Sequence, residues 1–231
     1  MTLLAELPDW VSPIAHYMLH EGLKGTLRIA AIALVGSTVV GILLGVLLTI
    51  DFRPSRALIR LYIEFWRGLP ILVTIFIIYF ALPALSRKLE FDPFTAAAIG
   101  LVLWGSAQVA EATRGAVQSI PREQHEAAAA LGFGWVGTQR FVILPQALRR
   151  LLPPLVSLLV NIIQNTTIAG VIGAAELLQT GQRSVERLTA PPPIGPGEVH
   201  AFEIYGAVMV VFFAMSFPLT RLAAYLERRL V

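Results

Sequence analysis

The sequence predicts an all-α integral membrane protein in which five transmembrane helices form a single domain over residues 1–231. The chain is 56% hydrophobic and 14% charged, and its mean hydropathy of +0.70 lies well above the usual range of soluble domains. A bilayer core about 30 Å thick needs about 20 mainly apolar helical residues to cross it. Five stretches satisfy this condition: Gly25–Ile50, Leu58–Leu82, Phe94–Arg114, Leu151–Ala175 and Phe202–Tyr225.

The charge and the cysteine content exclude several classes of site. The net charge of +3 comes from arginines in a few connecting segments, not from a basic face with exposed aromatics, so we expect no nucleic-acid binding. A chain without cysteine has no disulfide, thiolate zinc site or iron–sulfur cluster. The first residues lack a basic segment followed by an apolar core, so we expect no cleavable signal peptide.

Two features are predicted near the N-terminus. Residues Pro8–Gly22 predict a short helix on the outer membrane face, with Trp10 at the level of the lipid headgroups. The first span then carries three small residues that let another helix approach closely, namely Gly36, Gly41 and Gly45. We therefore expect this span to pack tightly against a neighbouring helix.

The arginines predict the orientation, because positively charged loops stay in the cytoplasm. Three segments are rich in arginine: the one after span one, the one after span three and the C-terminus. Their arginines are Arg53, Arg56 and Arg60, then Arg122, Arg140, Arg149 and Arg150, then Arg228 and Arg229. With five spans, the N-terminus lies outside and the C-terminus in the cytoplasm. The external segment Thr189–His200 is rich in proline, so we expect it not to be helical.

The cytoplasmic loop between spans three and four, residues 121–146, predicts a helix-turn-helix. Pro121 begins a helix whose first turns carry acidic residues, and Gly132 ends it as a C-cap glycine. A second short amphipathic helix, Val136–Leu144, ends at Pro145. From the residues alone the loop is either a plain connector or a docking element with aromatic anchors, and both interpretations stay open.

Two motifs of enzymes and nucleotide-binding proteins fail in this chain. His125-Glu126 begins an HExxH zinc pattern, but Ala129 occupies the position of the second histidine, so we predict no metal site. The phosphate-binding pattern GxxxxGK[ST] does not occur. We therefore predict no catalytic residue and no cofactor in this chain, and any energy from ATP must come from a partner.

The loop and its surroundings resemble a known family. The run Glu126-Ala127-Ala128, followed by Gly132 and then by Ile143-Leu144-Pro145, is similar to the EAA loop of ABC-importer permease subunits. Four further segments are similar, in order, to the branch that takes up polar amino acids: EFWRGLPIL (64–72), AEATRGAVQSI (110–120), LPQALRRLLPPL (144–155) and NTTIAGVIGAAEL (165–177). The resemblance extends from about residue 20 to the C-terminus.

The resemblance implies a multi-pass permease of the bacterial cytoplasmic (inner) membrane that translocates polar amino acids. Its partners would be two ATP-binding subunits, a second identical or paralogous permease, and an extracytoplasmic substrate-binding protein. The loop at 121–146 would couple the permease to the ATPase. Glu126, Ala127 and Gly132 match the family motif, and the physics of interfaces adds Phe133 and Trp135 as aromatic anchors.

Polar side chains inside the fourth span are the candidates for a substrate path, because polar groups in lipid face a partner or a water-filled cavity. Asn161, Gln164 and Asn165 share one helical face, and Thr166 and Thr167 flank it, while Gln108 comes from span three. Hydrogen bonds between helices are the alternative interpretation. The family often has a lysine and an aspartate where this chain has Gln164 and Asn165. The loss of that acid favours neutral or acidic amino acids over cationic ones.

Two ion pairs are predicted near the cytoplasmic ends of spans two and three. Glu64 and Arg67 are spaced i,i+3, and so are Glu111 and Arg114. Each pair either neutralises itself along its own helix or exchanges partners between helices as a gate. Side chains that reach the headgroups without any gating role are the alternative.

Other functions remain open at this point. A permease of the same fold for an amino-acid derivative or another small polar solute is the nearest alternative. A channel or secondary transporter is disfavoured because the spans show no obvious inverted repeat. A membrane-embedded enzyme would need a convergent catalytic site within the spans, and all four histidines lie outside them.

Overall fold

A computed structural model describes residues 8–49 and 52–230, and this part of the chain is helical with no strand. Four helical stretches are long and apolar enough to cross a membrane, and a bent helix pair raises the number to five. In chain order the helices are α1 (Val11–Tyr17), η1 (Met18–Leu23), α2 (Lys24–Leu47), α3 (Arg53–Gly68), α4 (Ile71–Phe76), η2 (Ile77–Ala81), α5 (Leu82–Leu85), η3 (Arg87–Leu89), α6 (Pro93–Gln118), α7 (Arg122–Ala130), α8 (Trp135–Thr138), η4 (Gln139–Ile143), α9 (Leu144–Asn165), η5 (Thr166–Ile172), α10 (Leu177–Thr189) and α11 (Ala201–Leu230).

The first span is one continuous helix from Val11 to Leu47. The prediction of a separate surface helix over Pro8–Gly22 is therefore wrong, because the π-helical turn Met18–Leu23 joins α1 directly to α2. Gly22 does not end a helix but allows a close contact, since a Cβ there would lie 3.0 Å from the Cα of Leu177 in α10. The predicted end of this span, Ile50, lies outside the described residues.

The packing of α2 on α6 confirms the predicted role of the glycines in span one. Cβ atoms added to Gly41 and Gly45 would lie 2.7 Å from backbone carbonyl oxygens of α6, those of Ser106 and Ala110. A Cβ on Gly36 would meet only a valine side chain of α6, at 2.8 Å. The two helices thus approach closely enough to exclude a methyl group over the turn from Gly41 to Gly45.

The second span, predicted over Leu58–Leu82, is a bent helix pair broken at Gly68. The helix α3 ends at Gly68, and the axis turns by 104° before α4 and the short segments that follow it. Leu69 is extended, with ψ of 137°, because the ring of Pro70 disfavours the helical conformation in the preceding residue. Pro70 also lacks the N–H that would continue the helical hydrogen bonds.

The third span, α6, follows its prediction closely and extends to Gln118. Asp92 caps its first turn by accepting hydrogen bonds from the backbone N–H groups of Phe94, at 3.0 Å, and Thr95, at 3.2 Å. Together with the hydroxyl of Thr95, these donors hold the pKa of Asp92 below its ordinary value. Pro93 at the first helical position has no N–H to satisfy and fits the same turn.

The fourth span is continuous with the loop before it. Helical conformation runs from Trp135 to Ile172, so the prediction that Pro145 ends a separate short helix is wrong. The π-helical turn Gln139–Ile143 precedes Pro145, and this wider turn accommodates the missing proline N–H within one helix. Gly173, at φ +87°, then ends the stretch.

The last part of the chain contains a helix that the sequence did not indicate. Glu176 caps α10 by accepting hydrogen bonds from the N–H groups of Leu178, at 2.9 Å, and Gln179, at 2.6 Å. The segment from 190 to 200 has no helix, which confirms the prediction for its prolines. Little of the final helix α11 is buried within the chain.

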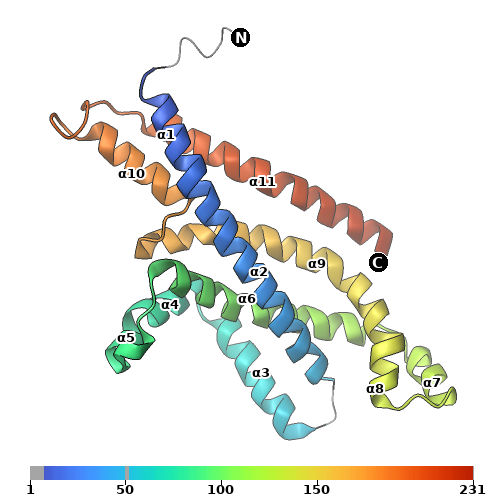
Figure 1. Cartoon of the computed structure of the whole chain (residues 1–231). Coiled ribbons are helices and arrows are strands. Elements are labelled where there is room, and N and C mark those ends of the chain that lie inside the picture. Colours follow the sequence, from blue (N-terminus) through green and yellow to red (C-terminus); the bar gives the residue numbers. More distant parts are fainter. Residues whose placement is uncertain (1–7, 50–51, 231) are drawn as a thin grey trace.

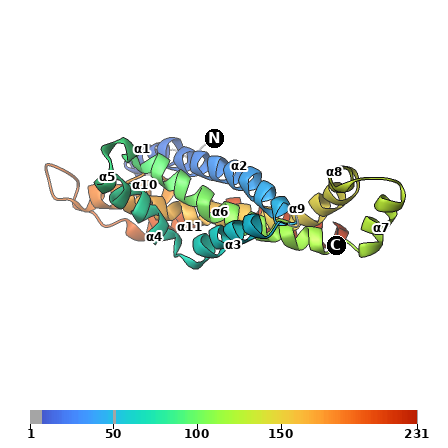
Figure 2. The same cartoon turned by 90° about the horizontal axis from the view of Figure 1, so that it is seen from below.

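The helices form an elongated body whose two ends carry different elements (Figures 1 and 2). α7 and α8 project at one end, and the loop after α10 projects at the other (Figures 1 and 2). The C-terminus and the end of α2 lie towards the end that carries α7 and α8 (Figures 1 and 2). The main hydrophobic core forms where α2, α4, α6 and α9 meet, around Ile29, Ile75, Leu101 and Ile162.

Candidate functional site

The projecting loop has the predicted helix and glycine turn. α7 ends in a Schellman motif: the N–H of Gly132 donates to the carbonyl of Ala129 at 2.9 Å, and the N–H of Phe133 donates to that of Ala128 at 3.1 Å. Gly132 has φ of +81°, a conformation that side chains rarely adopt, so the glycine is required for this turn. This turn connects α7 to α8.

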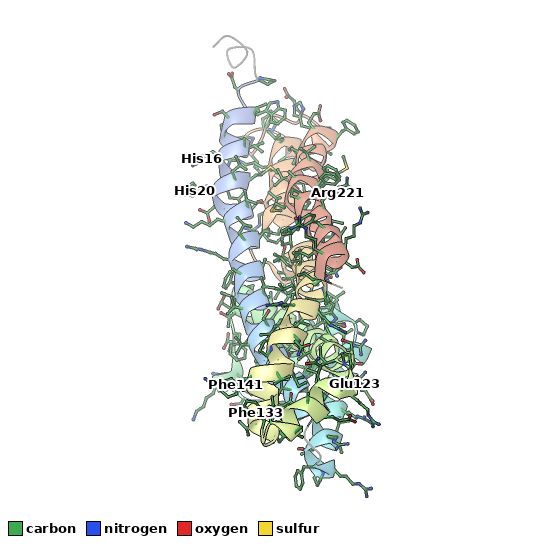
Figure 3. The ribbon with its side chains drawn as sticks, turned by 90° about the vertical axis from the view of Figure 1, so that its right-hand side faces the viewer. His16, His20, Glu123, Phe133, Phe141 and Arg221 are labelled. Atoms are coloured by element: carbon green, nitrogen blue, oxygen red, sulfur yellow. The ribbon has the colours of Figure 1, made fainter. Side chains whose placement is uncertain are left out.

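The predicted coupling residues lie on the surface of this loop. Glu126, Ala127 and Gly132 are exposed, Phe133 is 39% exposed and Trp135 is 46% exposed. The ring of Phe133 lies 6.1 Å from that of Phe141, and Figure 3 shows both at the end of the molecule remote from His16. The loop thus leaves two aromatic side chains partly exposed at this end of the molecule.

A cavity of about 700 Å³ lies between α6, α9 and α11. It brings together three of the predicted substrate-path residues, Gln108, Asn161 and Asn165, with Trp104 beside them. Gln164, Thr166 and Thr167 are not among its lining residues. The hydroxyls of both threonines bond to backbone carbonyls one turn back, at 2.7 Å for Thr166 and 2.8 Å for Thr167.

Hydrogen bonds orient the amide groups in the cavity. The Nδ2 atom of Asn161 donates to the carbonyl of Ser157 at 3.1 Å, and the Nδ2 atom of Asn165 donates to that of Asn161 at 2.8 Å. Each asparagine keeps its carbonyl oxygen as an acceptor. Gln108 is turned the other way, because its Oε1 atom accepts from the Nε atom of Arg67 at 3.2 Å, which leaves its NH₂ group as a donor.

A second cavity, of about 260 Å³, gathers all four predicted gate residues, Glu64, Arg67, Glu111 and Arg114, together with Arg60. Arg114 pairs with Glu111 along α6, with Nε 3.0 Å from Oε2. Arg67 instead contacts Gln108, which belongs to the first cavity. The predicted pairing along one helix is therefore present at Glu111 and Arg114, whereas Arg67 reaches across from α3 to α6.

The structure adds residues to the large cavity that the sequence analysis missed. Pro153, Pro154 and Ser157 continue the face of Asn161 at helical spacing, and this periodicity was a usable signal. Ala223 and Glu227 come from α11, and nothing local in the sequence indicates that α11 reaches the cavity. Among the residues at 8–49 and 52–230, no group of three or more potential ligand side chains is placed to hold a metal ion.

Comparison with known proteins identifies the family. The family of binding-protein-dependent transport system inner membrane components matches residues 25–231. The chain is 40% identical over 213 residues to the glutamine transport system permease protein GlnP of Escherichia coli, covering 92% of this chain and 93% of the relative. It is 32% identical to the probable glutamine ABC transporter permease protein GlnM of Bacillus subtilis, with the same coverage of both chains.

Solved structures agree with this assignment. A structure described as an amino acid ABC transporter with histidines matches with a TM-score of 0.80 and 27% identity, over 96% of this chain and 99% of that one. An inward-facing structure of the MetNI methionine ABC transporter shares the fold, with a TM-score of 0.76 at 18% identity, over 97% of this chain and all of that one. The chain belongs to the binding-protein-dependent transport system inner membrane components, and it is a permease subunit of an ABC transporter, not an enzyme.

Proposed function

We propose that this permease carries a polar amino acid and that the 700 Å³ cavity is part of its path. The observation that supports the proposal is the opposed polarity of the cavity walls. The α6 wall presents the NH₂ group of Gln108 with Arg67 behind it, and the α9 wall presents the carbonyl oxygens of Asn161 and Asn165. An amino acid in its zwitterionic form matches this arrangement, with its carboxylate towards Gln108 and its ammonium group towards the asparagines.

The proposal places the N-terminus outside and the C-terminus in the cytoplasm. Two of the arginine-rich segments, those that follow α6 and end α11, lie towards the same end of the molecule (Figures 1 and 2). Positively charged segments favour the cytoplasmic side, so this end faces the cytoplasm. There α7 and α8 contact one of two ATP-binding subunits through Glu126, Ala127 and the aromatic anchors Phe133 and Trp135, and a second permease completes the path.

In this proposal the energy of the ATPase drives alternating access. The charged cavity around Glu111 acts as the gate, since Arg67 has partners on two sides. It bonds to Gln108 in the large cavity and lines the small cavity with Glu64 and Glu111. A change of partner at Arg67 would therefore link the state of the gate to the state of the substrate path.

The test of the function is uptake into vesicles that contain this chain and a cognate ATPase, with the binding protein added outside. Glutamine and other polar amino acids are supplied as radiolabelled probes. Accumulation that requires ATP inside the vesicles supports the proposal. Accumulation without the ATPase indicates a channel or secondary transporter, and accumulation of a solute other than an amino acid indicates a permease of the same fold for a different substrate.

Replacing Glu111 by glutamine is expected to lower ATP-driven uptake about tenfold without preventing assembly. The change removes the ion pair with Arg114 and leaves that guanidinium with a neutral partner, and a hydrogen bond to a charged group contributes about 1.5–3 kcal/mol. Initial uptake rates and co-purification with the ATPase measure the two effects. Glu90→Gln, in the exposed connection before α6, is the control; equal uptake by both variants and the wild type would argue against a gate at Glu111.

A further inference from the structure

Glu227 is the feature of the large cavity that the proposed function does not use. Among the described residues that line this cavity, Glu227 is the one with a formal charge. The other polar side chains there are neutral: the amides of Gln108, Asn161 and Asn165, the hydroxyl of Ser157 and the indole of Trp104. Glu227, an exposed residue of α11, is therefore the formal charge that the described lining of the cavity contributes.

Glu227 is followed directly by two basic residues of the described chain, Arg228 and Arg229. No salt bridge to its carboxylate is present among these residues, and the neighbouring Arg229 instead stacks on Tyr225, with its guanidinium carbon 5.0 Å from the ring centre. Arg67 bonds to Gln108 but does not line the large cavity, and the small cavity that it lines also holds Glu64 and Glu111. The negative charge of Glu227 is thus available to a solute in the large cavity.

The position of Glu227 is at one mouth of the cavity. The α9 wall extends from Pro153 to Asn165, which is about 18 Å at the helical rise. α11 ends beside the beginning of α9, at the end that carries α7 and α8 (Figures 1 and 2). Glu227 therefore lies at the mouth nearest that end, which the proposed orientation assigns to the cytoplasm.

We propose that Glu227 makes this cavity discriminate against amino acids with a net negative charge. A cavity with one sign of charge and low-dielectric walls focuses its field on the solute, so an acidic side chain is repelled while a neutral zwitterion is not. The α9 residues that line the cavity carry no formal charge, and Glu227 acts against the acidic substrates. The substrate class is then neutral polar amino acids; this inference rests on the proposed function.

The experiment compares glutamine with glutamate, because the two have nearly the same size and differ by one charge. Vesicles with this chain and its ATPase are preloaded with either amino acid, and the uptake of labelled glutamine is measured with the binding protein outside. Internal amino acid enters the cavity through the mouth at Glu227 and competes with transport, without selection by the binding protein. We expect internal glutamine to inhibit wild-type uptake at a concentration about threefold or more below that of internal glutamate.

Three variants test whether the charge of Glu227 causes the difference between internal glutamine and glutamate. Glu227→Gln is expected to make glutamate as inhibitory as glutamine, whereas Glu227→Asp keeps the charge and keeps the difference. Glu203→Gln, at the opposite end of α11 and outside the cavity, is the matched control and behaves like the wild type. The inference is overturned if the two internal amino acids inhibit the wild type equally or if neither inhibits it. It is also overturned if Glu227→Gln still distinguishes glutamine from glutamate. A wild type without ATP-dependent amino-acid uptake is a separate result, which rejects the proposed function itself.

Discussion

Replacing Trp135 by alanine is expected to weaken the binding of the ATPase about thirtyfold. Trp135 begins α8 directly after the glycine turn, and nearly half of its surface is exposed. Large aromatic side chains in this setting supply much of the energy of an interface, and removing one typically costs about 2 kcal/mol or more. A loss of about 2 kcal/mol corresponds to about a thirtyfold rise in Kd. Titration of the ATPase against the permease in lipid nanodiscs measures this Kd.

The control for Trp135 is Phe202→Ala. Phe202 is 90% exposed and lies in the first turn of α11, at the end of the molecule away from the loop. Its truncation removes more exposed apolar surface than the truncation of Trp135 but should leave the Kd for the ATPase unchanged. If Trp135→Ala binds the ATPase as tightly as the wild type, the loop at 121–146 is a connector and the docking surface lies elsewhere.

Replacing Gly41 by alanine is expected to destabilise the permease by about 3 kcal/mol, at the upper end of the usual cost of overpacking. The added Cβ would clash with the Cβ of Val109 and would lie 2.7 Å from the carbonyl oxygen of Ser106. Because the oxygen belongs to the backbone of α6, a rotamer change cannot relieve the contact, and the two helices must separate. The apparent Tm in detergent and the monodisperse fraction in size-exclusion chromatography should both fall.

Gly206→Ala is the matched control for Gly41→Ala, since it also lies within a helix but has open space where the Cβ would be. There the change should be neutral or slightly stabilising, because alanine has the higher helix propensity. Gly36→Ala should fall between the two, because its Cβ meets a valine side chain that can move. Equal Tm values for the Gly41 and Gly206 variants would show that α2 and α6 pack less closely than the structure indicates.

The sequence predicts those parts of the fold that depend on local chemistry. The predicted helix end at Gly132 is confirmed, because a C-cap glycine and the hydrogen bonds around it lie within six consecutive residues. Pro70 and Pro145 show the limit of local rules, since both follow a leucine and yet the backbone differs at the two sites. The chain turns by 104° at Pro70, whereas a π-helical turn keeps the helix continuous through Pro145. The choice depends on what each segment packs against.

The same limit applies to the site. Asn161 and Asn165 are predictable because residues spaced i,i+4 share a helical face, and both line the cavity. Gln164, at i+3 from Asn161, is also on this face but does not line the cavity, because the face that such spacing defines is wider than the cavity. Glu227 and the contact of Arg67 with Gln108 depend on how distant helices cross, and no periodicity within one helix carries that information.

The unbroken helical stretch from Trp135 to Ile172 has a mechanical consequence. It acts as a lever, with the surface proposed to meet the ATPase at one end and an asparagine of the cavity wall far along it. Measured along the helix, Trp135 and Asn161 are about 39 Å apart at the helical rise. The stretch bends between α8 and α9 (Figure 1), so a tilt of about 10° around the docking end would displace Asn161 by less than the roughly 7 Å expected for a straight helix of this length. In the proposed mechanism the movement passes along this stretch to the cavity, because the π-helical turn before Pro145 keeps the backbone helical.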